Sequence, residues 1–270
     1  MIRKTLLAAS VLFFSFGALS CADEEERTTQ PPPFSNTKDL ISLHYDHAPD
    51  QDDGHSAAAD RSILETLYGP EWIKAHTVAV SGAYGRNKRF FLPESDAVMD
   101  ATWNDLGGWL AAHTDRDAVV SELAERWTKT LEANGTVWVK EGGQSDLTAD
   151  VIRRIEKGSP QVNSAERIVV VQHSQWNEDH TGFLALRYTK KHAVYIRIPD
   201  ANAYFQVIGG DERFEQAARQ HPRFGTAWEA AFAYYDPAKL IDFSDTGELL
   251  YILGFEPMSI DEFRQRFLAD

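Results

Sequence analysis

Residues 40–69 read LISLHYDHAPDQDDGHSAAADRSILETLYG. The apolar run that opens this stretch predicts a strand over 40–46, and the spacing of the later apolar residues predicts a helix over 56–69. Between them, residues 44–55 hold four aspartates and three histidines in twelve positions. So many potential ligand side chains directly after a strand indicate a functional site, and the question is which ion or reaction they serve.

The same strand-then-helix pattern recurs along the chain. Further strands are predicted at 77–85, 136–143, 167–174 and 192–200. Helices are predicted at 117–135, 145–158, 211–222, 226–236 and 259–270. Apolar, β-branched strands that alternate with helices are typical of an α/β fold. We therefore expect a mostly parallel, Rossmann-like sheet with helices on both faces.

Polar segments follow four of the predicted strands. They are HYDHAPDQDDGH (44–55), SGAYGRNK (81–88), KEGGQSD (140–146) and HSQWNEDHT (173–181). In a parallel sheet all strands end at the same edge, and ligands bind there. We therefore expect these segments to meet in one site.

The N-terminus has the layout of a secretory signal. Arg3 and Lys4 precede a short apolar run, which ends in ALSC with Cys21 as the only cysteine of the chain. This layout resembles a bacterial lipobox, in which a lipid is attached to the cysteine after cleavage. We therefore expect a signal peptide at 1–20 and a lipid-anchored protein of the cell envelope. Ala22 favours the outer membrane, with the protein facing the periplasm.

The residues after Cys21 are acidic and then proline-rich, which predicts a flexible tether over 21–38 and one folded domain over 39–270. The formal net charge of −14 argues against a nucleic-acid partner, since phosphate binding needs a basic face. We expect a small-molecule partner and contact with the membrane through the lipid anchor only.

Two kinds of metal site fit residues 44–55. His44, Asp46 and His47 have part of the spacing of a zinc hydrolase, with a distant ligand such as His173. The second half of the stretch is rich in carboxylates, which suits the oxygen-binding ions Ca²⁺ or Mg²⁺. Both interpretations stay open on spacing alone.

The segment DHAPDQDDG, 46–54, resembles the nucleoside hydrolase signature D-x-D-P-x-x-D-D-A. It matches that signature at Asp46, Pro49, Asp52 and Asp53, between the same kinds of strand and helix. The resemblance implies a nucleoside hydrolase-like fold with a calcium ion bound by Asp53. It further implies that Asp52 accepts hydrogen bonds from sugar hydroxyls.

Later segments resemble further motifs of the same family in the same order. SGAYGRN ends in Asn87, and QWNE contains Asn177; both amides would contact the sugar. GGQSDL places Ser145 where a main-chain carbonyl binds calcium, and AYYDPA places Asp236 at a late calcium ligand. In all, the resemblance covers most of residues 39–240.

Two positions depart from the family pattern. Ala48 stands where the signature has its second Asp, which is a calcium ligand close to the attacking water, and Tyr235 replaces the His before the late Asp. Asp50 lies two residues after Ala48 and would supply the missing carboxylate as the catalytic base, unless a metal-bound hydroxide acts without a protein base. Asp46 would then support the metal ligands or replace one of them, and His47, His55 or His173 would assist the leaving group.

Three functions follow as hypotheses. The first is a calcium-dependent hydrolase of N-glycosidic bonds in ribosides or related glycosides, in which a metal-activated water attacks an oxocarbenium-like centre. The second is a lipoprotein of the same fold that binds calcium and carbohydrate with little or no turnover. The third is a zinc hydrolase that uses His44, Asp46 and His47.

Overall fold

Six parallel strands form the central sheet of the protein, for which the computed structural model describes residues 31–48, 52–85, 91–234 and 240–269. The strands are β1 (Leu40–Tyr45), β2 (Thr77–Ser81), β3 (Trp109–Ala111), β4 (Val137–Gly142), β5 (Ile168–Gln172) and β6 (Val194–Arg197). Their order across the sheet is β3-β2-β1-β4-β5-β6. The chain therefore builds outward in both directions from β1 and β4, and a crevice opens where these two strands end.

Strand β1 pairs with β2 and β4 along its two edges, and helices cover both faces of the sheet, so all residues of β1 are buried. Leu43 pairs with Ala79 of β2 and with Lys140 of β4. Side chains alternate along a strand. Ile41, Leu43 and Tyr45 accordingly belong to one hydrophobic core, whereas Leu40 belongs to another.

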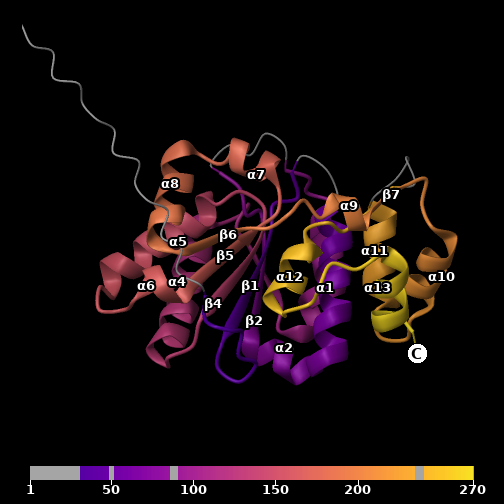
Figure 1. Ribbon diagram of the computed structural model, residues 1–270, viewed down its shortest axis with the longest axis horizontal. Coiled ribbons are helices and arrows are strands. Elements are labelled where there is room, and N and C mark those ends of the chain that lie inside the picture. The colour runs from indigo at the N-terminus through magenta and orange to yellow at the C-terminus, as the bar shows by residue number, and fades with distance from the viewer. Residues whose placement is uncertain (1–30, 49–51, 86–90, 235–239, 270) are drawn as a thin grey trace, which may run out of the picture.

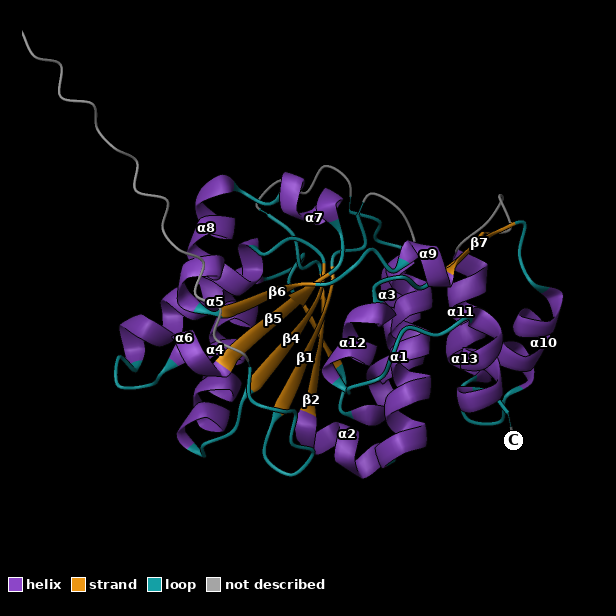
Figure 2. Ribbon diagram, viewed as in Figure 1, coloured by secondary structure: helices purple, strands orange, loops and turns teal. Residues whose placement is uncertain are grey.

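Helices cover both faces of the sheet, which Figure 2 shows between two groups of helices. The first group contains α1 (Asp52–Tyr68), α2 (Pro70–His76), α3 (Ser95–Trp103), α10 (Glu212–Gln220), α11 (Gly225–Tyr234), α12 (Thr246–Ile252) and α13 (Ile260–Phe267). The second group contains α4 (Arg116–Glu132), α5 (Asp146–Gly158), α6 (Ser164–Arg167) and α8 (Phe183–His192).

Shorter elements lie outside these layers. They are η1 (Asn104–Leu106), α7 (Gln175–His180), α9 (Asn202–Phe205) and the antiparallel pair β7 (Gln206–Ile208) and β8 (Leu240–Asp242). Helices α7 and α9 lie near the edge at which the strands end (Figure 1).

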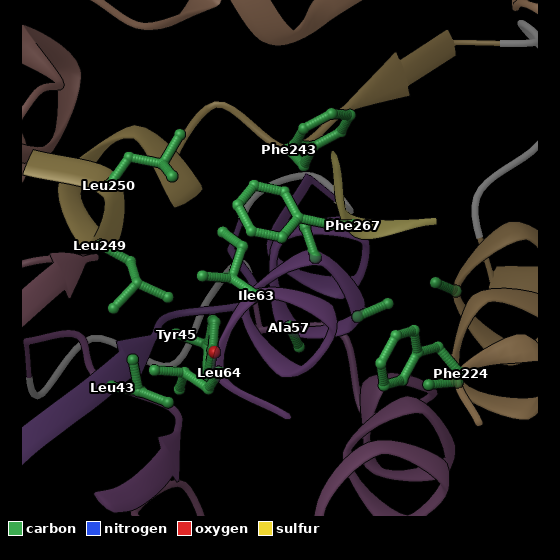
Figure 3. Close-up of a cluster of buried hydrophobic side chains, with 14 of the residues drawn as sticks. Leu43, Tyr45, Ala57, Ile63, Leu64, Phe224, Phe243, Leu249, Leu250 and Phe267 are labelled. Carbon is green, nitrogen blue, oxygen red and sulfur yellow. The ribbon is translucent and has the colours of Figure 1, made fainter. Parts of the chain in front are cut away.

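The larger core joins β1 to α1 and α12. Leu43 and Tyr45 of β1 lie near Ile63 and Leu64 of α1, with Leu249 from α12 close by (Figure 3). Burying one such aliphatic side chain stabilises a fold by about 1.5–3 kcal/mol. This core therefore fixes α12, which is distant in sequence, beside the start of the chain's folded part.

The predicted α/β fold with a parallel sheet between two helical layers is confirmed. Helix α1 begins at Asp52, four residues before the predicted start, because Asp52 and Asp53 occupy its first turn, where negative charge is favoured. The QWNEDH segment forms helix α7 and not a loop. The sequence did not predict the three-residue edge strand β3 or the short helices α2, α3 and α12.

Gly143 lies at the tightest point of the crevice. A Cβ atom built on Gly143 would lie 2.5 Å from the carbonyl oxygen of Ala83 and 2.7 Å from the Cβ of Asp46. The next residue, Gln144, donates its backbone N–H to that same Ala83 carbonyl at 2.9 Å. The ends of β1, β2 and β4 can therefore approach one another only because position 143 lacks a side chain.

We predict that Gly143→Ala destabilises the fold by about 1–3 kcal/mol, because the extra methyl group overpacks backbone that cannot move freely. Thermal unfolding followed by circular dichroism measures this effect. Gly158→Ala is the matched control, since a Cβ there meets nothing within 4 Å. Equal melting temperatures for the two variants would contradict the close approach at Gly143.

Candidate metal and substrate site

Asp46 is the first residue after β1, and two hydrogen bonds orient its carboxylate. Oδ1 accepts the backbone N–H of Ala48 at 2.8 Å, and Oδ2 accepts a side-chain N–H of Gln144 at 3.2 Å. Gln144 follows β4, so Asp46 is held by both strands that border the crevice. Ala48 itself is buried, and it lines a pocket at this edge of the sheet.

Asp52 and Asp53 lie in the first turn of α1. Oδ2 of Asp53 accepts the backbone N–H of His47 at 2.5 Å, and Oδ1 of Asp52 accepts the backbone N–H of Asp53 at 2.9 Å. The other oxygen of Asp53, Oδ1, is buried, and no N–H or O–H group in the described segments donates to it. Asp53 therefore keeps an acceptor available for an ion.

Asp245 brings the late part of the chain to this place. It precedes α12. One carboxylate oxygen from each of Asp52, Asp53 and Asp245 lies within 4.8 Å of the other two. We call Asp52, Asp53 and Asp245 the acidic cluster. Asp53 and Asp245 are buried and Asp52 is partly exposed, so the cluster opens toward solvent on one side only.

Burial and mutual repulsion set the charges in the cluster. Burial first, and then the charges of Asp245, Asp46 and Asp52, raise the pKa of Asp53 well above its ordinary value. Burial also opposes ionisation of Asp245, but Lys140 and His173 outweigh it and hold its pKa below the usual range.

The acidic cluster fits a divalent cation. Burial and the neighbouring carboxylates favour a proton on Asp53, which is hydrogen-bonded with Asp245. A divalent cation would replace that proton and use the available oxygen of Asp53. All three donors are carboxylate oxygens, which suits Ca²⁺ or Mg²⁺ better than zinc.

A second group of potential ligands shares Asp245. His173 follows β5, and its Nε2 lies 2.9 Å from Oδ1 of Asp245. Oε1 of Glu248 accepts the backbone N–H of His173 at 2.9 Å. Burial alone would lower the pKa of His173, but Asp200 and Asp245 raise it to about 10. Burial and Asp245 raise the pKa of Glu248 to about 8.

A pocket of about 440 Å³ lies over these groups at the carboxyl edge of the sheet. Its walls include Asp46, Ala48, Asp52, His173 and Asp245. The pocket is also lined by α7 and the residue before it and by the start of α9 and the segment before it, through Ser174, Gln175, Trp176, Asn177, Asp200 and Asn202. Most of these side chains are polar, so the pocket suits a ligand that has many hydroxyl groups.

The structure brings together most of the predicted site residues that it describes. Asp46, Asp52, His173 and Asn177 line the pocket, and Asp53 lies beside them in the acidic cluster. Ser145 differs, because its carbonyl accepts the backbone N–H of Ala149 at 2.9 Å within α5 and the Thr189 hydroxyl at 3.4 Å. It is therefore engaged in helix packing and does not line the pocket. Cys21, Asp50, Asn87 and Asp236 lie outside the described residues.

The predicted zinc ligand His44 lies apart from this site. Its Nε2 bonds with the Ser42 hydroxyl at 3.0 Å, and its Nδ1 lies 3.2 Å from Oε1 of Glu141. Ser42, His44 and Glu141 thus have the connectivity of a hydrolase triad. All three are fully buried within the sheet, so no substrate can reach them. Neither His44 nor His47 belongs to a potential metal group among the described residues.

Asp245 and Glu248 were missed by the sequence analysis. Their signal is the segment LIDFSDTGEL, 240–249, in which a short apolar run leads into aspartates, as β1 leads into Asp46. The resemblance to the family motif directed attention to Asp236 instead. A lysine at a predicted strand end slightly favours a surface position over a place in the site, but the side chain of Lys140, next to Asp245, is fully buried.

Comparisons with known proteins do not assign the chain to a family: no family model, curated protein or solved structure matches it. Within the described segments, no helix combines the length and the apolar character needed to cross a membrane.

We predict that Asp53→Asn and Asp245→Asn each abolish stabilisation by calcium, because each removes a charged ligand. At a calcium concentration of about 100 times Kd, the native chain should melt about 5–10 °C higher than in EDTA. Differential scanning fluorimetry measures this difference. Asp261→Asn is the control, since Asp261 is an exposed carboxylate on α13. A full calcium shift in both cluster variants would place the ion elsewhere.

Proposed function

We propose that the protein is a calcium-dependent hydrolase of N-glycosidic bonds in ribosides or related glycosides, similar to nucleoside hydrolases. One observation carries this proposal. The Asp52–Asp53 pair after β1 meets Asp245 under a polar pocket, at the point where the strand order reverses. The pair stands at the position that the resemblance to nucleoside hydrolases implies for it.

Asp53 and Asp245 would hold the ion, and Asp52 would face both the ion and the substrate. When bound, calcium would orient sugar hydroxyls and lower the pKa of a water molecule. Asp52 is the only member of the acidic cluster that is partly exposed, so its carboxylate can accept hydrogen bonds from sugar hydroxyls. Trp176 and Asn177 line the same pocket, where they would contact the base and the sugar.

The chemical step breaks the bond between the anomeric carbon and the base nitrogen. The electron pair of that bond leaves with the base, and the water oxygen bonds to the anomeric carbon. Asp46, held by Ala48 and Gln144, would accept the water proton. The sequence argument gives the same role to Asp50, which lies outside the described residues. His173, whose pKa is raised to about 10, would give a proton to the leaving nitrogen.

The sequence argument for a lipid anchor agrees with the position of the pocket. Phe34 packs edge-on against Trp72 and Trp138, and the chain then enters β1 at the amino edge of the sheet. The pocket lies at the opposite, carboxyl edge. A lipid on Cys21 at an outer membrane would therefore connect to the domain away from its substrate entrance.

Two alternative functions have supporting observations. Ala48 places a methyl group in the pocket where the family has a carboxylate, which favours a protein that binds calcium and carbohydrate with little turnover. His173, Asp245 and Glu248 present a mixed nitrogen and oxygen set within 4.8 Å, which favours zinc. Metal analysis of the purified protein separates zinc from calcium.

We expect the purified protein to release free sugar from at least one member of a panel that contains inosine, uridine and a chromogenic riboside. Calcium should support this activity and EDTA should remove it. Asp52→Asn should lower kcat/KM by about 100-fold because it weakens the hold on the sugar hydroxyls, whereas Asp261→Asn should not change it. Calcium-dependent sugar binding without turnover across the panel would favour the binding protein instead.

Restoring the missing carboxylate tests the role of position 48. We predict that Ala48→Asp tightens calcium binding about tenfold or more, since it adds a negative charge beside Asp46 on the pocket wall. Isothermal titration with calcium chloride measures the change. Ala48→Asn is the matched control of similar size. Unchanged affinity in Ala48→Asp would mean that this position does not face the ion.

A further inference from the structure

Lys140 is a fully buried lysine at the floor of the site. It belongs to β4, and its Nζ lies 4.1 Å from the centre of the Tyr45 ring. Nζ forms an ion pair with Oδ2 of Asp60 in α1, at 3.7 Å. Within the described part of the chain, Nζ has no hydrogen-bond partner. A buried ammonium group in this state needs an explanation.

The tip of Lys140 points toward the acidic cluster. A Cβ atom on Gly142 would lie 2.6 Å from Nζ of Lys140 and 3.2 Å from the Cβ of Asp245. The ammonium group therefore lies beside the last residue of β4 and close to Asp245. Gly142 and Asp245 both line the pocket, so Lys140 is separated from the substrate space by one layer of atoms.

Lys140 does not form an ordinary buried ion pair. Such pairs are stable when hydrogen bonds satisfy both partners. Here Oδ2 of Asp60 accepts the Tyr45 hydroxyl at 2.7 Å, and the ammonium group stays 3.7 Å away. Burial disfavours its charge, but Asp60, Asp245, Asp53 and Glu248 together outweigh burial and raise its pKa. Lys140 is thus a cation held by the field of several carboxylates.

We propose that Lys140 is an internal cation of the acidic cluster, which stabilises the ligand carboxylates before a divalent ion binds and weakens the binding of that ion. This inference rests on the metal site of the proposed function. Both effects have one cause, because the ammonium group attracts Asp53 and Asp245 and repels any cation between them. The affinity of the site is therefore set by a residue that does not touch the ion.

The test replaces Lys140 by methionine, which has a similar length and no charge. Calcium chloride alone is titrated into each protein by isothermal calorimetry, and melting is followed in EDTA and in calcium. We expect Lys140→Met to bind calcium about tenfold or more tightly. In EDTA its melting temperature should fall by about 5–10 °C, because buried carboxylates lose their counter-charge.

A second variant should change affinity in the opposite direction. Asp60→Asn removes a negative charge that offsets Lys140, so its calcium affinity should fall about threefold or more. Asp60 is not a member of the acidic cluster, and Asn keeps an acceptor for the Tyr45 hydroxyl. Lys74→Met is the control, since Lys74 pairs with Glu71 on the exposed surface of α2.

The outcomes separate this inference from the proposed function. If the native chain binds calcium and Lys140→Met binds it equally tightly or more weakly, the inference is overturned and the metal site stands. Calcium binding by Lys140→Met but not by the native chain would support the inference and overturn calcium-dependent activity of the native chain. Binding by neither protein would overturn both. If Lys140→Met does not fold in EDTA or calcium, unchanged or tighter calcium binding by Asp60→Asn overturns the inference.

Discussion

Several carboxylates are buried together at one edge of the sheet, and their repulsion must be offset for the fold to form. Asp53, Asp245 and Glu248 lie out of solvent. Lys140 and His173 bring positive charge to them, and the start of α1 brings the positive end of a helix dipole to Asp53. Since removing one partner of a buried charge network is costly, the cations and carboxylates depend on one another. A divalent ion would complete this balance.

The sequence predicted the parts of this arrangement that follow from local patterns and the parallel sheet. Apolar runs predicted the five longer parallel strands, and a parallel sheet necessarily places their ends at one edge. This is why Asp46 and Asp52, which follow β1, meet His173 and Asn177, which follow β5, in one pocket. That these four residues lie close together could be predicted without any knowledge of side-chain packing. The activity itself remains a proposal from that geometry.

The remaining parts depend on packing that no local pattern records. Asp245 reaches Asp53 because α12 packs against β4 and α1 through the larger core, with Leu249 among the residues that hold it. The burial of the charged Lys140 depends on carboxylates that lie far from it in sequence, among them Asp60 and Asp245. The motif around Ser145 matched in sequence, but its carbonyl is engaged by helix α5 and by Thr189.

Ala48 and Lys140 act on the cluster in the same direction. Ala48 omits one negative charge from the pocket wall, and Lys140 adds a positive charge beneath it. On the proposed metal site, both would make the protein a weaker cation ligand than an all-carboxylate site. A calcium ion would then be bound most tightly when the hydroxyls of a sugar complete its coordination. Such a site links ion and substrate, since each raises the affinity for the other by the same factor. Calcium affinity measured without a sugar should therefore understate the affinity of the working site.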